Sequence, residues 1–415
     1  MKILWLSHFI PYPPRGGSRQ RSFSLIRHIS AKYDTHLVAL NMQGENPGRA
    51  AEYANELRKH CASVEIWEPP YRWRGARWWA QLAFSPFYRQ PYGCRALWSP
   101  ELARRWEAKL KEHPEALVHF DSIYLALYIS PAAERRKVLN HHNCESAMAE
   151  RRAQKEPNPV KKAYLWNQAG KLRRLEEAVC HQFDVNLTVS QLDKQTLLER
   201  NLRAHCYVVE NGTDTDYFHP SETPPEPNTI VFAGGLSWYP NVSGLQFFVR
   251  EIWPILKQKC PGSRFYLAGR TPALAVRQLA ESDPAITLVS DPEDIRPWIW
   301  KGAVFICPII DGGGTRLKIL DALALGKAVV STTIGIEGLE VRMGLDVIVA
   351  DKPQDFAADV CRLLSDPGLC ARLAANGRAT VERLYSWKVI GSHLEKAYTC
   401  AMSQSCQIEG AAICE

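Results

Sequence analysis

The chain has 415 residues, of which 46% are hydrophobic and 23% are charged, and its formal net charge is +7. This balance is that of an ordinary globular protein and excludes disordered and fibrous classes, while the length predicts two domains with separate cores. The longest apolar runs, such as residues 303–310, are too short to span a membrane.

The first residues of the chain predict a strand. Residues 1–6 are mostly apolar, but His8, Pro11, Pro13 and Pro14 interrupt the run, so we expect no signal peptide. Twelve cysteines are scattered along the chain, and none of them forms a C-x-x-C pair. Reduced cysteines and the missing signal peptide lead us to expect a cytoplasmic protein.

Strand-like runs alternate with helical periodicity along both halves of the chain, which is typical of parallel sheets joined by crossover helices. In the first half we expect strands at 2–7, 36–40, 64–67, 116–120, 137–139, 184–189 and 208–209. In the second half we expect strands at 229–233, 264–268, 286–289, 304–306, 328–331 and 347–349. The expected helices are 23–29, 164–183, 244–259, 316–324, 353–364 and 369–384, and a last helical segment follows residues 385–387.

A proline-rich segment separates the two halves. Residues 218–227 hold four prolines in ten positions, which is the composition of a linker. We therefore expect an α/β protein with two doubly wound, Rossmann-like domains, residues 1–220 and 228–385. Ligands of such domains bind at the carboxyl ends of the strands and in the cleft between the domains. A last helix, residues 386–403, is expected to return to the first domain.

The most informative motif follows the expected strand at 304–307, where Gly312, Gly313 and Gly314 lead into a helix. Glycines at such a turn let backbone N–H groups approach an anion, and a helix N-terminus favours negative charge. An ordinary tight turn is the alternative interpretation. Neither a Walker loop nor a G-x-G-x-x-G after the first strand of either half is present, which disfavours a nucleotide hydrolase or a dehydrogenase.

Charged residues accompany this turn. Arg316 and Lys318 stand in the first turn of the expected helix and add fixed positive charge. Asp321 lies further along the same helix, where a carboxylate can accept hydrogen bonds from ribose hydroxyls. Phosphate binding combined with an acceptor for a sugar diol is what recognition of a nucleotide sugar requires. The alternative is that these charges face solvent.

These residues resemble the donor-binding core of the bacterial group 1 retaining glycosyltransferases of GT-B fold. The resemblance is strongest over residues 304–339 and extends to 232–241, 189–190, 211–214 and 385–387. It implies that the first domain binds the acceptor and that the second binds a nucleoside diphosphate sugar. It also implies that no cofactor and no protein nucleophile take part, so that catalysis depends on positioning and electrostatics.

The chain departs from the family pattern in two places. The family commonly has two glutamates eight positions apart, whereas here the first position is Gly313 and the second is Asp321. The arginine and lysine often found after the first strand of the second domain are replaced by residues 236–238, so we expect Arg316 and Lys318 to bind the diphosphate. Asp311 or the glycine backbone would then meet the sugar hydroxyl. The residues expected to bind the donor are Gly16, Gly17, Gly235, Asp311, Gly312, Gly313, Gly314, Thr315, Arg316, Lys318 and Asp321.

Two histidines follow the expected strand at 137–139. The family often keeps a histidine near this point that contacts the transferred sugar, and His142 fits that position better than His141. We therefore expect His142 to act in catalysis together with Arg316 and Lys318, with a purely structural histidine as the alternative. The residues His119 and Asp121, just after another strand, are weaker candidates of the same kind.

One apparent metal motif is set aside. Residues 214–216 spell D-x-D, a metal–diphosphate signature in a different glycosyltransferase fold. Here the motif follows Asn211 and Gly212 in a turn that resembles the GT-B relatives. We therefore expect no metal site.

A basic and aromatic segment lies in the first half of the chain. Residues 71–98 contain five arginines, four tryptophans and no acidic residue. Such a composition suits the headgroup region of an anionic bilayer, so we expect peripheral contact with the inner face of the cytoplasmic membrane. The alternative is a segment packed on its own domain. Single-stranded nucleic acid ranks last because no recognised nucleic-acid-binding module accompanies the segment.

The expected function is transfer of a hexose-type sugar, with retention, from a nucleoside diphosphate sugar to a glycan or lipid-linked acceptor. The product would be a cell-surface polysaccharide, a lipopolysaccharide or a glycolipid. Two alternatives are a sugar-nucleotide epimerase of GT-B shape and a non-catalytic nucleotide-sugar-binding or scaffold protein. The glycine-rich cationic core and the basic aromatic segment favour transfer.

Overall fold

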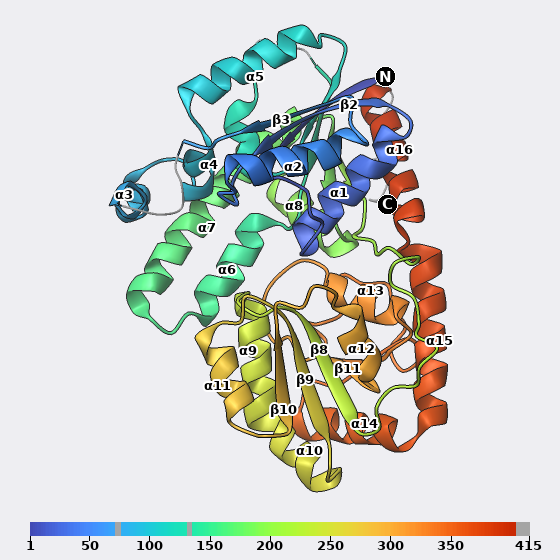
Figure 1. Cartoon of the computed structure of the whole chain (residues 1–415). Coiled ribbons are helices and arrows are strands. Elements are labelled where there is room, and N and C mark those ends of the chain that lie inside the picture. Colours follow the sequence, from blue (N-terminus) through green and yellow to red (C-terminus); the bar gives the residue numbers. More distant parts are fainter. Residues whose placement is uncertain (71–75, 131–134, 404–415) are drawn as a thin grey trace, which may run out of the picture. The chain divides into compact units, whose positions relative to one another are not determined.

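The computed structural model describes residues 1–70, 76–130 and 135–403 (Figure 1). The chain divides into two compact units. Unit 1 comprises Met1–Glu210 together with the described residues from Ile390 onward, and unit 2 comprises Asn211–Val389. Each unit contains one parallel sheet, which confirms the expected α/β architecture of two Rossmann-like domains.

Unit 1 has a seven-stranded sheet in the order β3-β2-β1-β4-β5-β6-β7, and all of its pairings are parallel. Its strands are β1 (Lys2–Ser7), β2 (Asp34–Leu40), β3 (Ser63–Trp67), β4 (Leu117–Phe120), β5 (Lys137–Asn140), β6 (Val185–Thr188) and β7 (Cys206–Val208). The chain runs outward from β1 through β2 and β3 and then returns to β4 on the other side. The point where the strand order reverses therefore lies between β1 and β4, where doubly wound sheets bind ligands.

The helices of unit 1 connect these strands. They are α1 (Gly17–Ser30), α2 (Pro47–Arg58), α3 (Ala76–Phe84), α4 (Tyr92–Leu97), α5 (Pro100–Glu112), α6 (Glu145–Lys155), α7 (Pro159–Val179), α8 (Gln191–Arg200) and α16 (Trp387–Met402), of which the part from Ile390 belongs to this unit. Short 3-10 helices occupy η1 (Ser85–Phe87), η2 (Ile123–Tyr128) and η3 (Cys180–Gln182). The apolar residues of β1 are buried between these helices, as expected for a central strand of a parallel sheet.

The C-terminal helix α16 packs on α1 and on the sheet of unit 1. Glu395 accepts a hydrogen bond of 3.0 Å from His28 and forms an ion pair with Lys32. A Cβ atom on Gly391 would lie 2.2 Å from the His28 ring, so only glycine allows this close approach. The Tyr398 hydroxyl lies 2.8 Å from Nδ1 of His119 at the middle of the sheet.

Unit 2 has a six-stranded parallel sheet in the order β10-β9-β8-β11-β12-β13. Its strands are β8 (Thr229–Gly235), β9 (Arg264–Arg270), β10 (Ile286–Ser290), β11 (Val304–Cys307), β12 (Ala328–Ser331) and β13 (Ile348–Val349). Its helices are α9 (Tyr239–Phe247), α10 (Trp253–Lys259), α11 (Leu274–Glu281), α12 (Arg296–Lys301), α13 (Leu317–Ala324), α14 (Pro353–Ser365) and α15 (Pro367–Leu384). Here the strand order reverses between β8 and β11.

The helix expected over residues 244–259 is interrupted in the structure. A π-helical turn, η4 (Phe248–Ile252), separates α9 from α10. Pro254 in the first turn of α10 has no N–H group to continue the ladder of the preceding helix, which accounts for the irregular turn.

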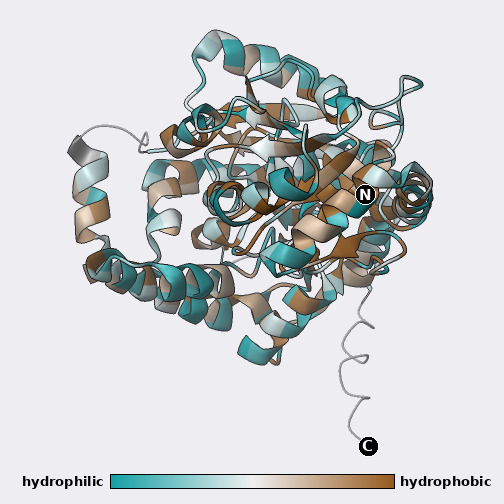
Figure 2. Cartoon of the chain, turned by 90° about the horizontal axis from the view of Figure 1, so that it is seen from below, coloured by the Kyte–Doolittle hydropathy of each residue, from teal (hydrophilic) through white to brown (hydrophobic). Residues whose placement is uncertain are grey.

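Hydrophobic residues are concentrated on the strands, and hydrophilic residues lie along the outer helices (Figure 2). Within the described ranges, no helix combines the length and the apolar composition that crossing a membrane requires. Nine cysteines of the described residues are free thiols.

Candidate active site

The glycine loop lies where the strand order of unit 2 reverses. It joins β11 to α13, and β8 is the neighbouring strand, so Gly235 ends at the same edge of the sheet. Gly312 and Gly314 have φ values of 105° and 71°, which side chains other than glycine rarely adopt. A Cβ atom on Gly312 would also lie 2.9 Å from the Pro240 ring at the start of α9. Glycine is therefore required here for both conformation and space.

Arg316 folds back on this loop. It precedes the first residue of α13, is 8% exposed, and donates hydrogen bonds to the carbonyl oxygens of Gly313 (2.5 Å) and Gly314. The N–H of Gly312 donates to Oδ1 of Asp311 at 2.6 Å, so Asp311 also holds the loop. Binding of a diphosphate by Arg316 and of a sugar by Asp311 stays a prediction, and Gly313 and Thr315 lie between them in the same loop.

Lys318 extends from α13 to the end of β8. Its ammonium hydrogen-bonds Oδ1 of Asn241 and lies 4.4 Å from the centre of the Phe232 ring. A Cβ atom on Gly234 would lie 3.2 Å from this ammonium. Burial lowers the pKa of Lys318 to about 8, because a low-dielectric surrounding disfavours the charged form. Lys318, which we expected to bind the diphosphate, thus reaches from the helix after β11 to the end of β8.

Asp321 is held by a segment from the start of unit 2. The Thr213 hydroxyl donates to Oδ1 of Asp321 at 2.6 Å, and Nδ2 of Asn211 donates to Oγ1 of Thr315, also at 2.6 Å. A Cβ atom on Gly212 would lie 2.8 Å from the Tyr385 carbonyl oxygen. The short motifs at 211–213 and 385–387 therefore converge on the glycine loop and α13, although more than 170 residues separate them in the sequence.

The D-x-D sequence forms a turn. The backbone N–H groups of Asp216 and Tyr217 lie 3.2 and 3.0 Å from Oδ1 of Asp214 and donate to it. The N–H of Phe218 donates to the Asp214 carbonyl oxygen. These bonds give Asp214 a local role in shaping the chain just before the proline-rich segment.

In unit 1, Gly16 and Gly17 open α1. Gly16 precedes the helix with a φ of 99°, and its carbonyl oxygen accepts a hydrogen bond from the N–H of Gln20. The loop from β1 thus enters the helix through a conformation that requires glycine. This geometry fits both a plain strand–helix turn and a phosphate-facing loop, so donor binding by Gly16 and Gly17 stays a prediction.

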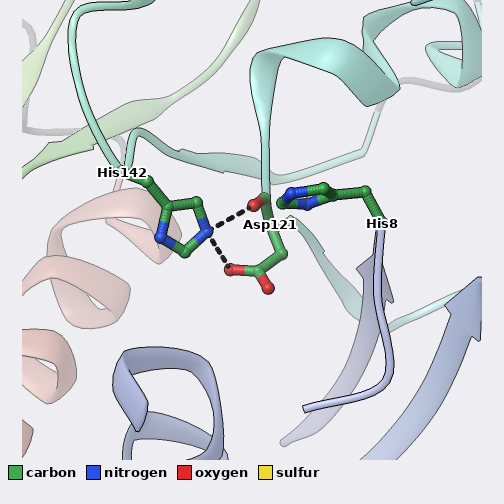
Figure 3. A group of neighbouring side chains, drawn as sticks. All are labelled: His8, Asp121 and His142. Carbon is green, nitrogen blue, oxygen red and sulfur yellow. Dashed lines mark hydrogen bonds and ion pairs between the residues drawn. The ribbon is translucent and has the colours of Figure 1, made fainter. Parts of the chain in front are cut away.

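Three side chains meet where the strand order of unit 1 reverses (Figure 3). His8 follows β1, Asp121 follows β4 and His142 follows β5 by two residues. Nε2 of His142 lies 2.9 Å from the carbonyl oxygen of Asp121 and 3.4 Å from its Oδ1. One donor atom of each residue lies within 4.8 Å of the others. His142 and Asp121, which the sequence analysis named separately, are thus in contact.

Asp121 is a buried anion surrounded by neutral donors. Its carboxylate accepts hydrogen bonds from the Ser7 hydroxyl (3.0 Å), the Ser22 hydroxyl (2.7 Å) and Nδ2 of Asn140 (2.7 Å). Burial by itself would raise the pKa of Asp121, but the electrostatic interaction and hydrogen bond with His142 outweigh it and hold the pKa well below its ordinary value. The group is therefore ionised at neutral pH.

The other two histidines named from the sequence have hydrogen-bond partners outside this group. His119 stacks on Trp5 with ring centres 3.5 Å apart and bonds Tyr398, and burial lowers its pKa to about 3. Nε2 of His141 lies 3.1 Å from Oδ1 of Asn186, and burial lowers the pKa of His141 to about 4. Both are neutral core residues.

His8 was missed as a site residue by the sequence analysis, which used it only as the end of an apolar run. Its ring lies 5.7 Å from that of His142, and burial lowers the pKa of His8 to about 3. The available signal was its position directly after the first strand of a parallel sheet.

The two units thus each carry a polar group at the reversal point of the sheet. In unit 2 it consists of a glycine loop with two cations and the carboxylates of Asp311 and Asp321, which suits a nucleoside diphosphate. In unit 1 it consists of a buried carboxylate and two histidines, which can exchange hydrogen bonds with hydroxyl groups.

Comparisons with known proteins agree with this description. A family model described as Glycosyltransferase Family 4 matches residues 15–217, and one described as Glycosyl transferases group 1 matches residues 227–366. An uncharacterised 44.6 kDa protein in the cps region of Klebsiella pneumoniae is 24% identical over 305 residues, which cover 71% of this chain and 76% of that protein.

Solved structures share the fold over nearly the whole chain. Sucrose-phosphate synthase from Thermosynechococcus elongatus is 16% identical, with a TM-score of 0.73 over 96% of this chain and 98% of that one. Anabaena HepE, solved in complex with UDP, is 14% identical, with a TM-score of 0.66 over 96% of this chain and 100% of that one. Because the two family models together span both sheets and these structures share the two-domain fold, the chain belongs to the group 1 glycosyltransferases of GT-B fold and is a glycosyltransferase.

Proposed function

We propose that this glycosyltransferase moves a hexose-type sugar, with retention of configuration, from a nucleoside diphosphate sugar to a glycan or lipid-linked acceptor. The products would be cell-surface polysaccharide, lipopolysaccharide or glycolipid. The observation that carries the proposal is the glycine loop at the strand-order reversal of unit 2, with Arg316 and Lys318 at the start of α13.

The donor would be bound in parts. The glycine loop and the N-terminus of α13 favour the diphosphate, and Lys318 supplies a positive charge at the same edge of the sheet. Asp321 would accept hydrogen bonds from the ribose hydroxyls, as carboxylate oxygens do, and Thr213 orients its carboxylate. His142 at the corresponding edge of unit 1 would contact the transferred sugar.

The relatives support the choice of donor and pathway. HepE was solved with UDP and with UDP-glucose, and Staphylococcus aureus TarM was solved with UDP and alpha-GlcNAc-glycerol. The Klebsiella pneumoniae relative is a protein of a cps region. For this chain we therefore propose a UDP-sugar donor and an acceptor of the cell-surface glycan class.

Contact with an anionic membrane surface is the second part of the proposal. Residues 71–75 of the basic aromatic segment lie outside the described residues. The helix α3 stands at the outer edge of unit 1 (Figure 1). We call Trp79 and Phe84 of this helix, together with Phe87 and Arg89 just after it, the α3 surface. Trp79, Phe84 and Phe87 are 62%, 58% and 84% exposed, which is unusual for large apolar side chains. Aromatic rings beside a cation suit the headgroup layer of a bilayer.

Thermal unfolding against a panel of UDP-, GDP-, ADP- and dTDP-sugars tests the donor site without knowledge of the acceptor. A ligand at about a hundred times its dissociation constant stabilises the fold by roughly 2.7 kcal/mol, which is an easily measured shift. We expect stabilisation by UDP and UDP-sugars, and a much smaller shift in the Arg316→Ala variant. If no nucleotide sugar of the panel raised the unfolding temperature, the result would contradict donor binding and favour a scaffold protein.

Product analysis then tests the reaction. Incubation with donor alone should give slow hydrolysis and no new nucleotide sugar, whereas an epimerase would give one. With acceptor, the NMR spectrum of the product should show the anomeric configuration of the donor. The inverted configuration would contradict the retaining part of the proposal.

A further inference from the structure

We propose that Asp121 is a positioning residue for His142, fixing the imidazole so that its Nδ1 atom accepts a hydrogen bond from a hydroxyl of the transferred sugar. The inference rests on the proposed function. It adds to that function a second residue, buried beneath the first, that sets the orientation of the histidine.

The carboxylate of Asp121 is itself fixed from several elements. Ser7 at the end of β1, Ser22 in α1 and Asn140 at the end of β5 all donate to it. The N–H of Asp121 donates to the Leu6 carbonyl oxygen at 2.9 Å. Such a carboxylate can neither rotate nor exchange partners without breaking several buried hydrogen bonds. It therefore offers a rigid reference point at the middle of the sheet.

Two acceptor atoms of Asp121 determine which nitrogen of His142 carries the proton. Nε2 lies 2.9 Å from the carbonyl oxygen of Asp121 and 3.4 Å from its Oδ1, and both atoms are acceptors. An imidazole nitrogen that faces two acceptors must carry a proton. In the neutral ring the lone pair is then on Nδ1, and Asp121 has selected that tautomer.

The packing around His142 determines where Nδ1 points. His142 keeps 8% of its side-chain surface exposed, while Asp121 has none. Phe9 and His8 lie against the imidazole, with ring centres 5.9 and 5.7 Å away. Asp121 and these two rings restrict the imidazole, and Nδ1 is on the opposite side from the Asp121 contact (Figure 3). A hydroxyl group that reaches the carboxyl ends of β4 and β5 would meet an acceptor there.

A metal ion is the competing interpretation of the same three residues, because their donor atoms lie within 4.8 Å of one another. A ligand atom must offer a free lone pair to the ion. However, Nε2 of His142 is a hydrogen-bond donor to Asp121, and both oxygens of that carboxylate already accept bonds from Ser7, Ser22 and Asn140. The contacts therefore favour a hydrogen-bonded pair.

The tautomer can be read directly by NMR. In protein labelled with 15N-histidine, the ring signals that disappear in the His142→Ala variant belong to His142. We expect a proton on Nε2 and none on Nδ1 at pH 7.5. A proton on Nδ1, in either the neutral or the charged ring, would overturn the inference.

Kinetics test whether Asp121 acts through His142. The Asp121→Asn variant should lower kcat roughly 10- to 100-fold, the loss of one hydrogen bond to a charged group, while KM for the donor stays near the wild-type value. In the His142→Ala variant, Asp121→Asn should lower kcat little further, because the imidazole that Asp121 orients is absent. An equal factor on both backgrounds, or wild-type kinetics in Asp121→Asn, would contradict the proposal.

Glu176→Gln is the matched control, since Glu176 is another buried carboxylate of unit 1 that accepts a bond from the N–H of Ser146. It should keep the wild-type kcat. Each variant must also retain stabilisation by UDP, which reports on unit 2 alone. Activity that a chelator abolishes and Zn²⁺ or Mn²⁺ restores would establish the metal interpretation instead. Absence of UDP stabilisation in the wild type would contradict the proposed function and not this inference.

Discussion

Thr213 donates a hydrogen bond of 2.6 Å to the carboxylate of Asp321. The hydroxyl is buried, and the backbone of Thr213 is held by the Tyr385 carbonyl oxygen at 2.8 Å. The proposed ribose ligand is therefore oriented by a residue more than 100 positions earlier in the chain. Asp321 is one methylene shorter than the glutamate common in the family, and this support fixes where the shorter acid points.

The Thr213→Val variant tests this support. Valine keeps the shape of threonine but removes the hydroxyl, so Asp321 loses a hydrogen bond worth roughly 1.5–3 kcal/mol. We expect the dissociation constant of UDP to rise about tenfold or more, as measured by calorimetry.

Thr223→Val serves as the control, because Thr223 is exposed in the proline-rich segment of the same unit. Its affinity for UDP should equal that of the wild type. If Thr213→Val also binds UDP normally, Asp321 does not contact the ribose or does not need Thr213 to do so.

Lys318 predicts two pH effects of opposite sign. Its pKa is lowered by burial to about 8 from 10.5. Between these values the unfolded chain binds more protons than the folded one, so the stability of the free protein rises with pH. A diphosphate needs the charged ammonium, so its affinity should fall above pH 8 by up to about tenfold per pH unit.

Calorimetric titration of UDP from pH 7 to pH 9.5 measures the second effect. In Lys318→Met the steep decline should disappear, and affinity at pH 7 should already be low. A wild-type affinity that stays constant to pH 9.5 would mean that the ammonium does not contact the diphosphate.

Much of the fold followed from local sequence. Continuous apolar runs such as residues 2–7 and 328–331 predicted strands whose bounds the structure reproduces, because buried parallel strands need little else. Short helices such as α4 and α8 were not predicted, because their apolar periodicity is weak. The helix predicted over residues 244–259 is interrupted after α9, because Pro254 breaks the hydrogen-bond ladder.

The candidate site was predicted in parts but not as a set. His142 and Asp121 were each expected at a strand end, but their contact depends on β4 and β5 being neighbours. Strand order is set by packing of the whole sheet and leaves no mark on the residues near either strand end. The same reason explains why His8 was missed. The hydrogen bonds of Arg316 to the loop carbonyls depend on its side-chain conformation, which the spacing of residues in the sequence does not determine.

Arg316 should be required both for the loop and for the donor. Because its guanidinium binds the carbonyl oxygens of Gly313 and Gly314, Arg316→Ala should loosen the loop and weaken UDP binding by at least tenfold. Arg316→Lys keeps the charge, but the side chain is shorter and lacks the planar guanidinium, so it should recover only part of the affinity. Unchanged affinity in Arg316→Ala, measured by calorimetry, would remove this residue from the donor site.

The α3 surface makes the membrane proposal measurable. Trp79 and Phe87 are exposed, whereas Trp78 is half-buried, so the double variant Trp79→Ser/Phe87→Ser removes ring surface without disturbing packing. Each ring that enters a bilayer contributes roughly 1.5–3 kcal/mol, so cosedimentation with vesicles rich in phosphatidylglycerol should fall about tenfold or more. Binding should also decline with salt and be weak on phosphatidylcholine vesicles, since screening removes the attraction of Arg89. Trp166→Ser on α7, where the side chain is 42% exposed, is the control and should bind normally. If the double variant binds vesicles like the wild type, the α3 surface does not contact lipid, and its exposed rings would belong to acceptor recognition.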